Sequence, residues 1–130
     1  MNVLTSHDYF VSNHITGDHG YVSIESLVCG FPVTKSGRNM CDIYAGFDCI
    51  VQPNKTLTVS TTIQINCTSP GFVFWIAGLD RPIENILVMS CLAVMDMPIK
   101  VKVFNSGHNP IFIGKYQNIA QIFVLNSVIN

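Results

Sequence analysis

The sequence predicts an all-β protein, a jelly-roll or β-barrel of short strands with little or no helix. Short segments with a period of two recur along the chain, about 8–12 residues apart, and turn residues separate them. No segment shows the 3.6-residue period of an amphipathic helix. A length of 130 residues suits one hydrophobic core. We therefore expect a single β domain over residues 1–130, in which residues 1–40 are the hardest to interpret.

The chain up to residue 77 contains three predicted strands. Tyr21–Val28 is the first of them. Thr56–Asn66 follows the turn residues Pro53-Asn54-Lys55 and alternates strictly, which is typical of a strand with one buried face. Phe72–Ala77 is rich in aromatic and β-branched residues and is expected to be mostly buried. The predicted buried face of the second strand consists of Leu57, Val59, Thr61, Ile63 and Ile65.

The second half of the chain contains a further series of strands. Ile86–Met95 is an apolar run that fits either a buried strand or a short helix, because its periodicity does not distinguish the two. Ile99–Phe104 alternates cleanly, with its lysines predicted to face outward. The turn Asn105–Pro110 leads to a short strand at Ile111–Ile113. Ile119–Val124 is the last predicted strand.

The composition predicts contact with another subunit and disfavours nucleic acid. Hydrophobic residues make up 48% of the chain and charged residues only 12%, about half of the roughly 25% usual for soluble domains. So few charges leave apolar surface that a second subunit would cover. The net charge is −1, and the seven Lys and Arg residues are spread thinly. Such a chain has no basic stripe with which to neutralise phosphates.

The sequence also predicts an intracellular protein, located in a host cytoplasm or nucleus and not secreted. Met1–Phe10 lacks the apolar core of a signal peptide. No continuous apolar segment approaches the roughly 20 residues that a membrane-spanning helix needs. The five cysteines form no C-x-x-C pair, which suits a reducing compartment better than a disulfide scaffold.

Two segments carry a resemblance to a known family. Ala45-Gly46-Phe47-Asp48-Cys49 resembles the first motif of trimeric dUTPases, and the segment from Gly114 to Ile122, which contains Ile119-Ala120-Gln121, resembles the fourth. The strand and turn pattern between them follows the same course, so the resemblance covers about residues 42–125. It implies a jelly-roll-like β-barrel that assembles as a homotrimer.

The resemblance extends only weakly to the catalytic motifs. Hydrolysis of a nucleoside triphosphate needs positive charge, a bound Mg²⁺ and a carboxylate that orients water. In the second motif, Ile76-Ala77 stand where the family has Arg-Ser, and only Gly78-Leu79 match. Asp96 aligns with the catalytic Asp of the third motif only across a gap, and the Gly-rich arm is missing. We therefore predict no catalytic residue and no cofactor. The residues left from a nucleotide site would be Asp48, Gly78, Asp96 and Gln121.

Each of these residues also has a structural interpretation. Asp48 fits a turn residue that accepts hydrogen bonds from nearby backbone N–H groups. Asp96 fits a turn or strand end before Pro98, and Gln121 fits a strand residue that hydrogen-bonds locally. The closely spaced His14, Asp18 and His19 suggest a metal site, but a loop explains them better because no further spaced ligand is nearby. We expect three cysteines to be small buried hydrophobes inside strands: Cys49, Cys67 and Cys91.

Three functions remain open on this evidence. The leading hypothesis is a non-catalytic, viral accessory protein that acts through host or viral proteins, because the chain resembles the first open-reading-frame proteins of adenovirus early region 4 in length and in its eroded motifs. Those proteins often end in a PDZ ligand, whereas Asn130 is polar and disfavours PDZ binding. The second hypothesis is a divergent hydrolase or sensor of dUTP or dCTP, the only case that would involve Mg²⁺. The third is a structural jelly roll of a virion.

Overall fold

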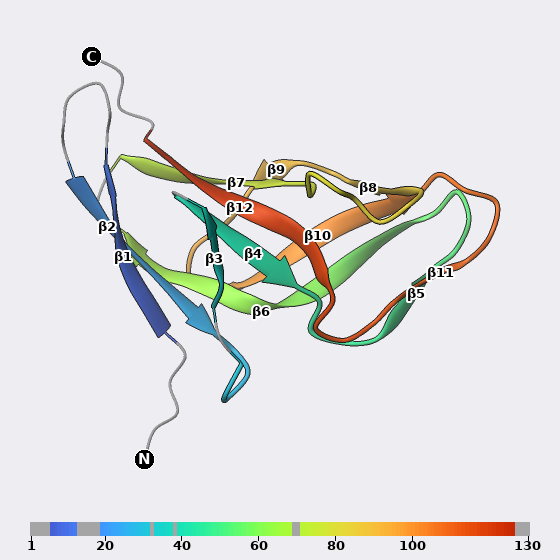
Figure 1. Cartoon of the computed structure of the whole chain (residues 1–130), viewed down its shortest axis with the longest axis horizontal. Coiled ribbons are helices and arrows are strands. Elements are labelled where there is room, and N and C mark those ends of the chain that lie inside the picture. The colour runs from blue at the N-terminus through green and yellow to red at the C-terminus, as the bar shows by residue number, and fades with distance from the viewer. Residues whose placement is uncertain (1–5, 13–18, 32, 38, 69–70, 127–130) are drawn as a thin grey trace.

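The structure is a computed structural model that describes residues 6–12, 19–31, 33–37, 39–68 and 71–126. Within these ranges the chain forms twelve β-strands and no helix (Figure 1), so the predicted all-β fold class is confirmed. The strands are β1 (Ser6–Ser12), β2 (His19–Ser26), β3 (Lys35–Gly37), β4 (Met40–Tyr44), β5 (Cys49–Val51), β6 (Thr56–Thr68), β7 (Phe72–Ala77), β8 (Ile86–Val88), β9 (Cys91–Leu92), β10 (Pro98–Asn105), β11 (Ile111–Ile113) and β12 (Asn118–Asn126).

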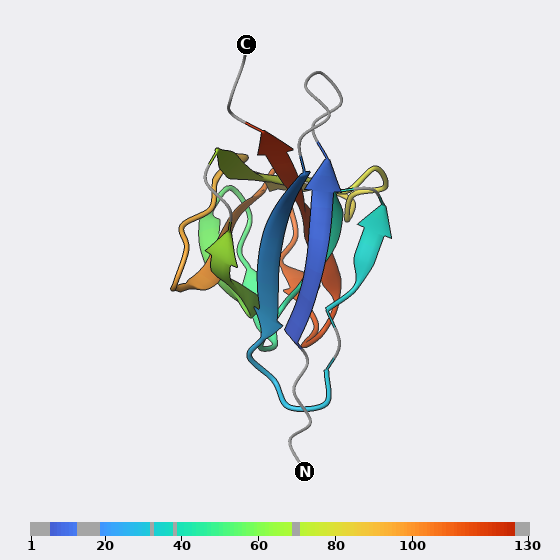
Figure 2. The ribbon, with the colours of Figure 1, turned by 90° about the vertical axis from the view of Figure 1, so that its left-hand side faces the viewer.

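The strands form two larger sheets and a small one. One five-stranded sheet has the order β1-β2-β6-β10-β8, and the other has the order β3-β4-β12-β7-β9. The third sheet pairs only β11 with β5, which lie at the far end of the molecule from β1 and β2 (Figure 1). All the strand pairs are antiparallel. The view along the molecule shows β1 and β2 side by side in front of the remaining strands (Figure 2).

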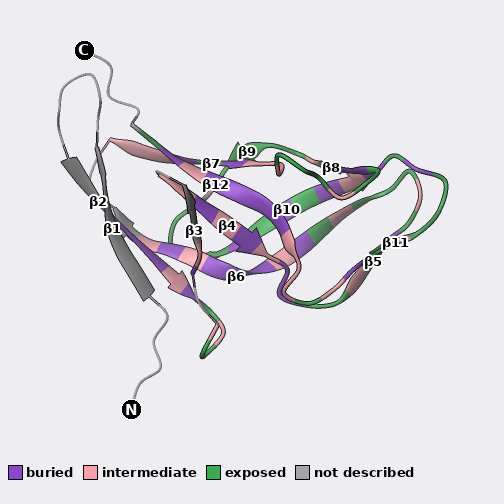
Figure 3. Ribbon diagram, viewed as in Figure 1, coloured by how far each residue is buried: buried purple, intermediate pink, exposed green. Residues whose placement is uncertain are grey.

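The core lies between the two larger sheets and follows the predicted alternation. Along β10 the odd-numbered residues from Ile99 to Asn105 are buried, whereas Lys100 and Lys102 are exposed. On β6, Val59, Ile63 and Ile65 are buried as predicted. In Figure 3 the buried residues gather on β4, β6, β10 and β12. Burial of these apolar side chains is the main force that holds the two layers together.

A buried asparagine fixes the end of β10. Asn105 is 0% exposed, and its Nδ2 donates to Val51 O at 2.9 Å and to Asn109 O at 2.8 Å. Its Oδ1 accepts the Gly107 N–H at 2.8 Å. All the polar atoms of this side chain are therefore satisfied, as burial requires. These hydrogen bonds connect the end of β10 to β5 and to the turn that follows β10.

The predicted apolar run 86–95 needs a correction. It is neither one buried strand nor a helix, because it divides into β8, which pairs with β10, and β9, which pairs with β7. Ile86 is buried, but most of the run is exposed, Cys91 included. The prediction that Cys91 is a buried hydrophobe is therefore wrong. The chain changes sheet between the two strands, so the apolar residues of this run lie at the edge of the sandwich and not in the core.

The other predicted strands are present, some with longer bounds. Phe72–Ala77 and Ile111–Ile113 match β7 and β11 residue for residue. The predicted strand Tyr21–Val28 is β2, two residues earlier in the chain. The described part of the chain contains no helix that is long and apolar enough to cross a membrane.

Candidate functional site

The two segments that resemble dUTPase motifs meet in space. The Ala45 N–H donates to Gln117 O at 2.9 Å, and the Tyr116 N–H donates to Ala45 O at 2.7 Å. The Gln117 side chain closes its own turn, because its Oε1 accepts the Gly114 N–H at 2.9 Å. We call this contact between residues 45–48 and residues 114–118 the motif junction. It joins the start of the β4–β5 connection to the turn before β12.

Asp48 belongs to the motif junction. Its Oδ1 accepts the backbone N–H of Lys115 at 2.6 Å, across 67 residues of sequence. The Lys115 Nζ lies 5.0 Å from the centroid of the Tyr116 ring, which is within the range of a cation–π contact. The carboxylate thus accepts a backbone hydrogen bond, as the structural interpretation of Asp48 predicts, although its partner is distant in the sequence.

A polar pocket lies beside the motif junction, on the outer face of the second sheet. Its volume is about 410 Å³. Gln121 is the central residue, because it pairs with Asp42 of β4 on one side and with Ala77 of β7 on the other. Its side chain is buried, and its Nε2 donates to Gly78 O at 3.2 Å. The pocket is lined by Asp42, Asp80, Arg81, Asn118 and Gln121, together with Met40 and Leu79.

The structure thus brings together two of the four predicted residues, Gly78 and Gln121. Asp48 lies in the motif junction and does not line the pocket. Asp96 occupies a turn with φ of 62° and donates its N–H to Ile65 O at 2.8 Å. It lines a different, apolar hollow beside Phe72. His14 and Asp18 lie outside the described residues, as does the side chain of His19.

Of the residues that line the pocket, only Gln121 was predicted from the sequence, and the unpredicted ones include Asp42 and Asn118. Asp42 is opposite Gln121 only because of the β4–β12 register, which has an irregularity between Asn118 and Ala120. The Oδ1 of Asn118 is buried and has no hydrogen-bond partner. The signal in the sequence was the charged Asp42 between the apolar Cys41 and Ile43, which are the buried residues of β4, so that Asp42 faces away from the core.

The pocket does not fit the triphosphate and Mg²⁺ that the family implies. Asp42 and Asp80 contribute two carboxylates, against the single guanidinium of Arg81. Phosphates need several donors or cations, and the carboxylates would repel them at short range. Among the described residues, no three His, Cys, Asp or Glu side chains are grouped as for a metal ion. The side chains that line the pocket therefore do not match the ligand set expected for Mg²⁺ and a triphosphate.

Three titratable groups in and next to β4 have a raised pKa, and burial is the first cause in each. Burial, followed by the nearby Asp42 carboxylate, raises the pKa of the Cys41 thiol to about 12. Burial also raises the pKa of Tyr44, whose hydroxyl donates to Asp42 Oδ2 at 3.3 Å. Burial and the Asp48 carboxylate raise the pKa of Cys49. Such thiols are poor nucleophiles, because the thiolate is the reactive form.

Comparison with known proteins agrees with the fold. The dUTPase of Staphylococcus bacteriophage 80alpha with dUPNHPP is similar, with a TM-score of 0.70, 9% identity, and 84% of each chain covered. A mutant dUTPase from phage phi11 of S. aureus gives a TM-score of 0.69 and 8% identity, over 84% of this chain and 92% of that chain. EIAV dUTPase gives a TM-score of 0.59 and 20% identity, over 74% of this chain and 84% of that chain.

The sequence itself decides the family. A search of curated proteins found no match. The family model described as dUTPase matches residues 32–129, which is most of the chain. These residues include both halves of the motif junction and the whole polar pocket. The chain therefore belongs to the dUTPase family.

Proposed function

We propose that this chain is a non-catalytic, viral member of the dUTPase family that assembles with copies of itself and acts through contacts with a host or viral protein. The observation that carries the proposal is the charge of the polar pocket. It has two carboxylates, Asp42 and Asp80, and one cation, Arg81. A pocket of this charge disfavours a nucleoside triphosphate, while the backbone bonds of the motif junction preserve the fold.

A large apolar surface supports the part of the proposal that concerns protein contacts. We call residues 86–97 the apolar edge; they comprise β8, β9 and the loop that leads to β10. This short segment holds six of the large hydrophobic side chains that are exposed in the described chain. Exposed apolar side chains close to one another mark interaction sites on soluble proteins, and three of the six line one pocket: Leu92, Val94 and Met97. The six side chains are Leu87, Met89, Leu92, Val94, Met95 and Met97.

An assay of pyrophosphate release tests the loss of catalysis. The chain is incubated with dUTP and Mg²⁺ beside a competent dUTPase, and we expect no release above the buffer rate. The mass of the chain in solution tests self-association, and a discrete trimer is the expected state. Turnover within a few orders of magnitude of the competent enzyme would contradict the proposal.

A second candidate function is binding of a nucleotide without hydrolysis. Asn118 and Gln121 favour it, because both residues line the pocket and the buried Oδ1 of Asn118 has no hydrogen-bond partner. A nucleobase N–H group would satisfy such an acceptor. Thermal unfolding with dUTP, dCTP and their imido analogues tests this candidate. A saturable rise in melting temperature supports it, because a ligand that binds only the native state stabilises it.

A further inference from the structure

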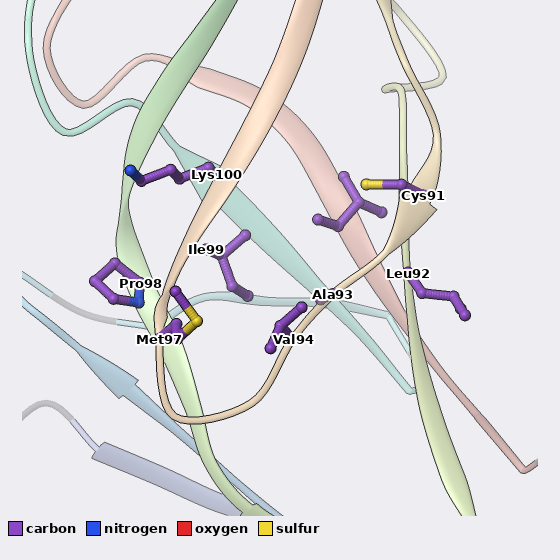
Figure 4. A pocket seen from close by; sticks show the side chains of 9 residues that line it. Cys91, Leu92, Ala93, Val94, Met97, Pro98, Ile99 and Lys100 are labelled. Carbon is purple, nitrogen blue, oxygen red and sulfur yellow. The ribbon is translucent and has the colours of Figure 1, made fainter.

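An apolar pocket opens at the apolar edge, between the two larger sheets. Its volume is about 330 Å³. Ile76 of β7 and Ile99 of β10 form its floor, and both are almost completely buried. Leu92, Val94 and Met97 line it with further apolar side chains. A pocket of this size and character accommodates an apolar group. Figure 4 shows it between β10 on one side and the Cys91–Val94 segment on the other.

The backbone of β10 has an unpaired edge at this pocket. The Met89 N–H donates to Lys102 O at 2.8 Å, so the backbone polar groups of Lys102 face β8. Because these directions alternate along a strand, those of Lys100 face the same side. The register of β8 covers only Val103–Asn105, and the chain then crosses to the other sheet as β9. Among the described strands, none pairs with Lys100 on this side.

Contacts on the opposite side of β10 agree with this direction. Ile99 O accepts the hydroxyl hydrogen bond of Thr61, which lies on β6, at 2.5 Å. Ser60, which pairs with Lys100, turns its carbonyl away from β10 to accept the Gly46 N–H at 2.7 Å. The Lys100–Ser60 pair is therefore one without ladder hydrogen bonds. The N–H and C=O of Lys100 are left for a strand on the other side.

The charge of this edge is positive. Lys100 and Lys102 are exposed on the outer face of β10, and their cross-strand neighbours Ser60 and Thr58 carry no charge. Figure 4 shows the Lys100 and Ile99 side chains leaving β10 on opposite sides, with Ile99 toward the pocket. An added strand would therefore place alternate residues in the pocket and beside the lysines.

We propose that the free edge of β10 at Lys100 binds an extended segment of a partner protein, in which an apolar residue is flanked by Asp or Glu. The segment adds as a strand, so its backbone bonds the N–H and C=O of Lys100. Its apolar side chain fills the pocket over Ile76 and Ile99, and its carboxylates pair with Lys100 and Lys102. This inference rests on the proposed function, since it names the partner chemistry of an interaction protein.

Selection from displayed random peptides of about ten residues, against the whole chain, tests the proposal. We expect an enriched pattern in which an apolar residue alternates with Asp or Glu. The Lys100→Glu variant should select basic residues at the same positions. Hydrogen exchange with the best peptide bound should show protection of the Lys100 amide. Enrichment of peptides without the acidic pattern, or of none, would overturn the proposal.

Two variants separate the backbone edge from the charge. Lys100→Gln removes only the charge and should weaken the selected peptide about threefold, whereas Lys100→Pro also removes the edge N–H and should weaken it at least about tenfold. Proline is tolerated where the N–H faces away from the ladder, and the melting temperature checks folding. If Lys100→Pro does not fold, alkylation of Cys91 with a bulky maleimide at the pocket mouth replaces it, with the same expected loss.

Further measurements distinguish a partner peptide from a second copy of this chain at the edge of β10, and edge binding from the proposed loss of catalysis. Lys55→Gln, on an exposed lysine outside this edge, should leave peptide binding unchanged. Equal binding by wild type and Lys100→Pro would overturn strand addition. If Lys100→Pro instead dissociates the oligomer of the chain, the edge is an interface between copies, and the proposed partner is wrong. Turnover of dUTP would defeat the proposed function but leave the measured edge binding standing.

Discussion

The motif junction and the apolar edge lie in the same β-sandwich, yet they differ in how far the chain itself pairs their polar groups and covers their apolar groups. At the motif junction, six hydrogen bonds are donated by the backbone N–H groups of residues 45–46 and 114–117. At the apolar edge, β9 has only two residues, and six large apolar side chains are exposed. The first region is held by contacts within one chain, whereas the second is the surface at which we propose that a partner binds.

This difference explains which parts of the family pattern this chain keeps. Asp48 and Gly46 each maintain contacts between segments far apart in the sequence, so their loss would loosen the fold itself. Residues 76–81 include no comparable contact beyond the β7 pairing and the bond from Gln121 to Gly78 O, which any residue could provide from its backbone. Structural hydrogen bonds therefore give a chain of this fold a reason to keep a motif that is independent of the motif's chemistry.

The largest expected difference between the two regions concerns thiol reactivity. Cys91 of the apolar edge is exposed, whereas Cys41, in the strand before the motif junction, is buried with its pKa raised from 9.0 to about 12. At pH 8 this rise alone lowers the thiolate fraction of Cys41 about a thousandfold. Site-resolved mass spectrometry after iodoacetamide treatment should show rapid alkylation of Cys91 and none of Cys41. Similar rates in the folded chain would contradict the burial described for β4.

The next largest effect is expected from a side chain added at Gly46. A Cβ there would lie 3.2 Å from Ser60 O and 3.3 Å from Thr61 O, both backbone atoms of β6 that have no room to move. Gly46→Val should therefore lower the free energy of unfolding by about 2 kcal/mol, measured by urea denaturation. Gly78→Val is the matched control, because a Cβ at Gly78 would lie 3.7 Å from Val88 Cβ, an ordinary van der Waals distance. An equal loss in both variants would show that Gly46 is not specially confined.

Sequence reasoning worked where the pattern was local. The alternation in 56–66 and 99–104 predicted β6 and β10 because burial on one face imposes a period of two. It did not settle 86–95, where the chain changes sheet, since an apolar run looks the same whether it faces the core or a partner. The short strands β3 and β5 were missed because three residues carry too little periodicity, whereas the equally short β11 was predicted because the turn Asn105–Pro110 precedes it.

The site was predicted only in part, for a related reason. Gln121 and Gly78 were selected from the motifs, and the structure joins them by a hydrogen bond. Asp42 and Asn118 line the pocket because of the register between β4 and β12. This register shifts between Asn118 and Ala120, and the sequence of neither strand alone predicts the shift. The partner of Asp48 is 67 residues away, so the sequence predicted a backbone partner but not Lys115.

Two adjacent threonines of β6 sharpen the comparison further, because their expected effects have opposite signs. Thr61 lies opposite Ala45 of the motif junction, and its hydroxyl donates to Ile99 O. Thr62 is 0% exposed, and its hydroxyl has no partner. Thr61→Val should cost about 1 kcal/mol, whereas Thr62→Val should stabilise the chain by about 1 kcal/mol, because it removes an unsatisfied buried group. Thermal and urea unfolding measure both, and the same sign for both would refute this assignment.

The smallest expected effect is at Asp48, and it tests whether the segment 45–49 has a structural role or binds nucleotide. Asp48→Ala removes the acceptor of the Lys115 N–H, but the site is exposed and water replaces part of the bond, so the expected loss is about 0.5–1 kcal/mol. Asp48→Asn keeps an acceptor oxygen and should lose less. Because Asp48 does not line the polar pocket, neither variant should alter any stabilisation by dUTP or dCTP. A nucleotide-dependent rise in melting temperature that disappears only in these variants would instead place Asp48 in a functioning nucleotide site.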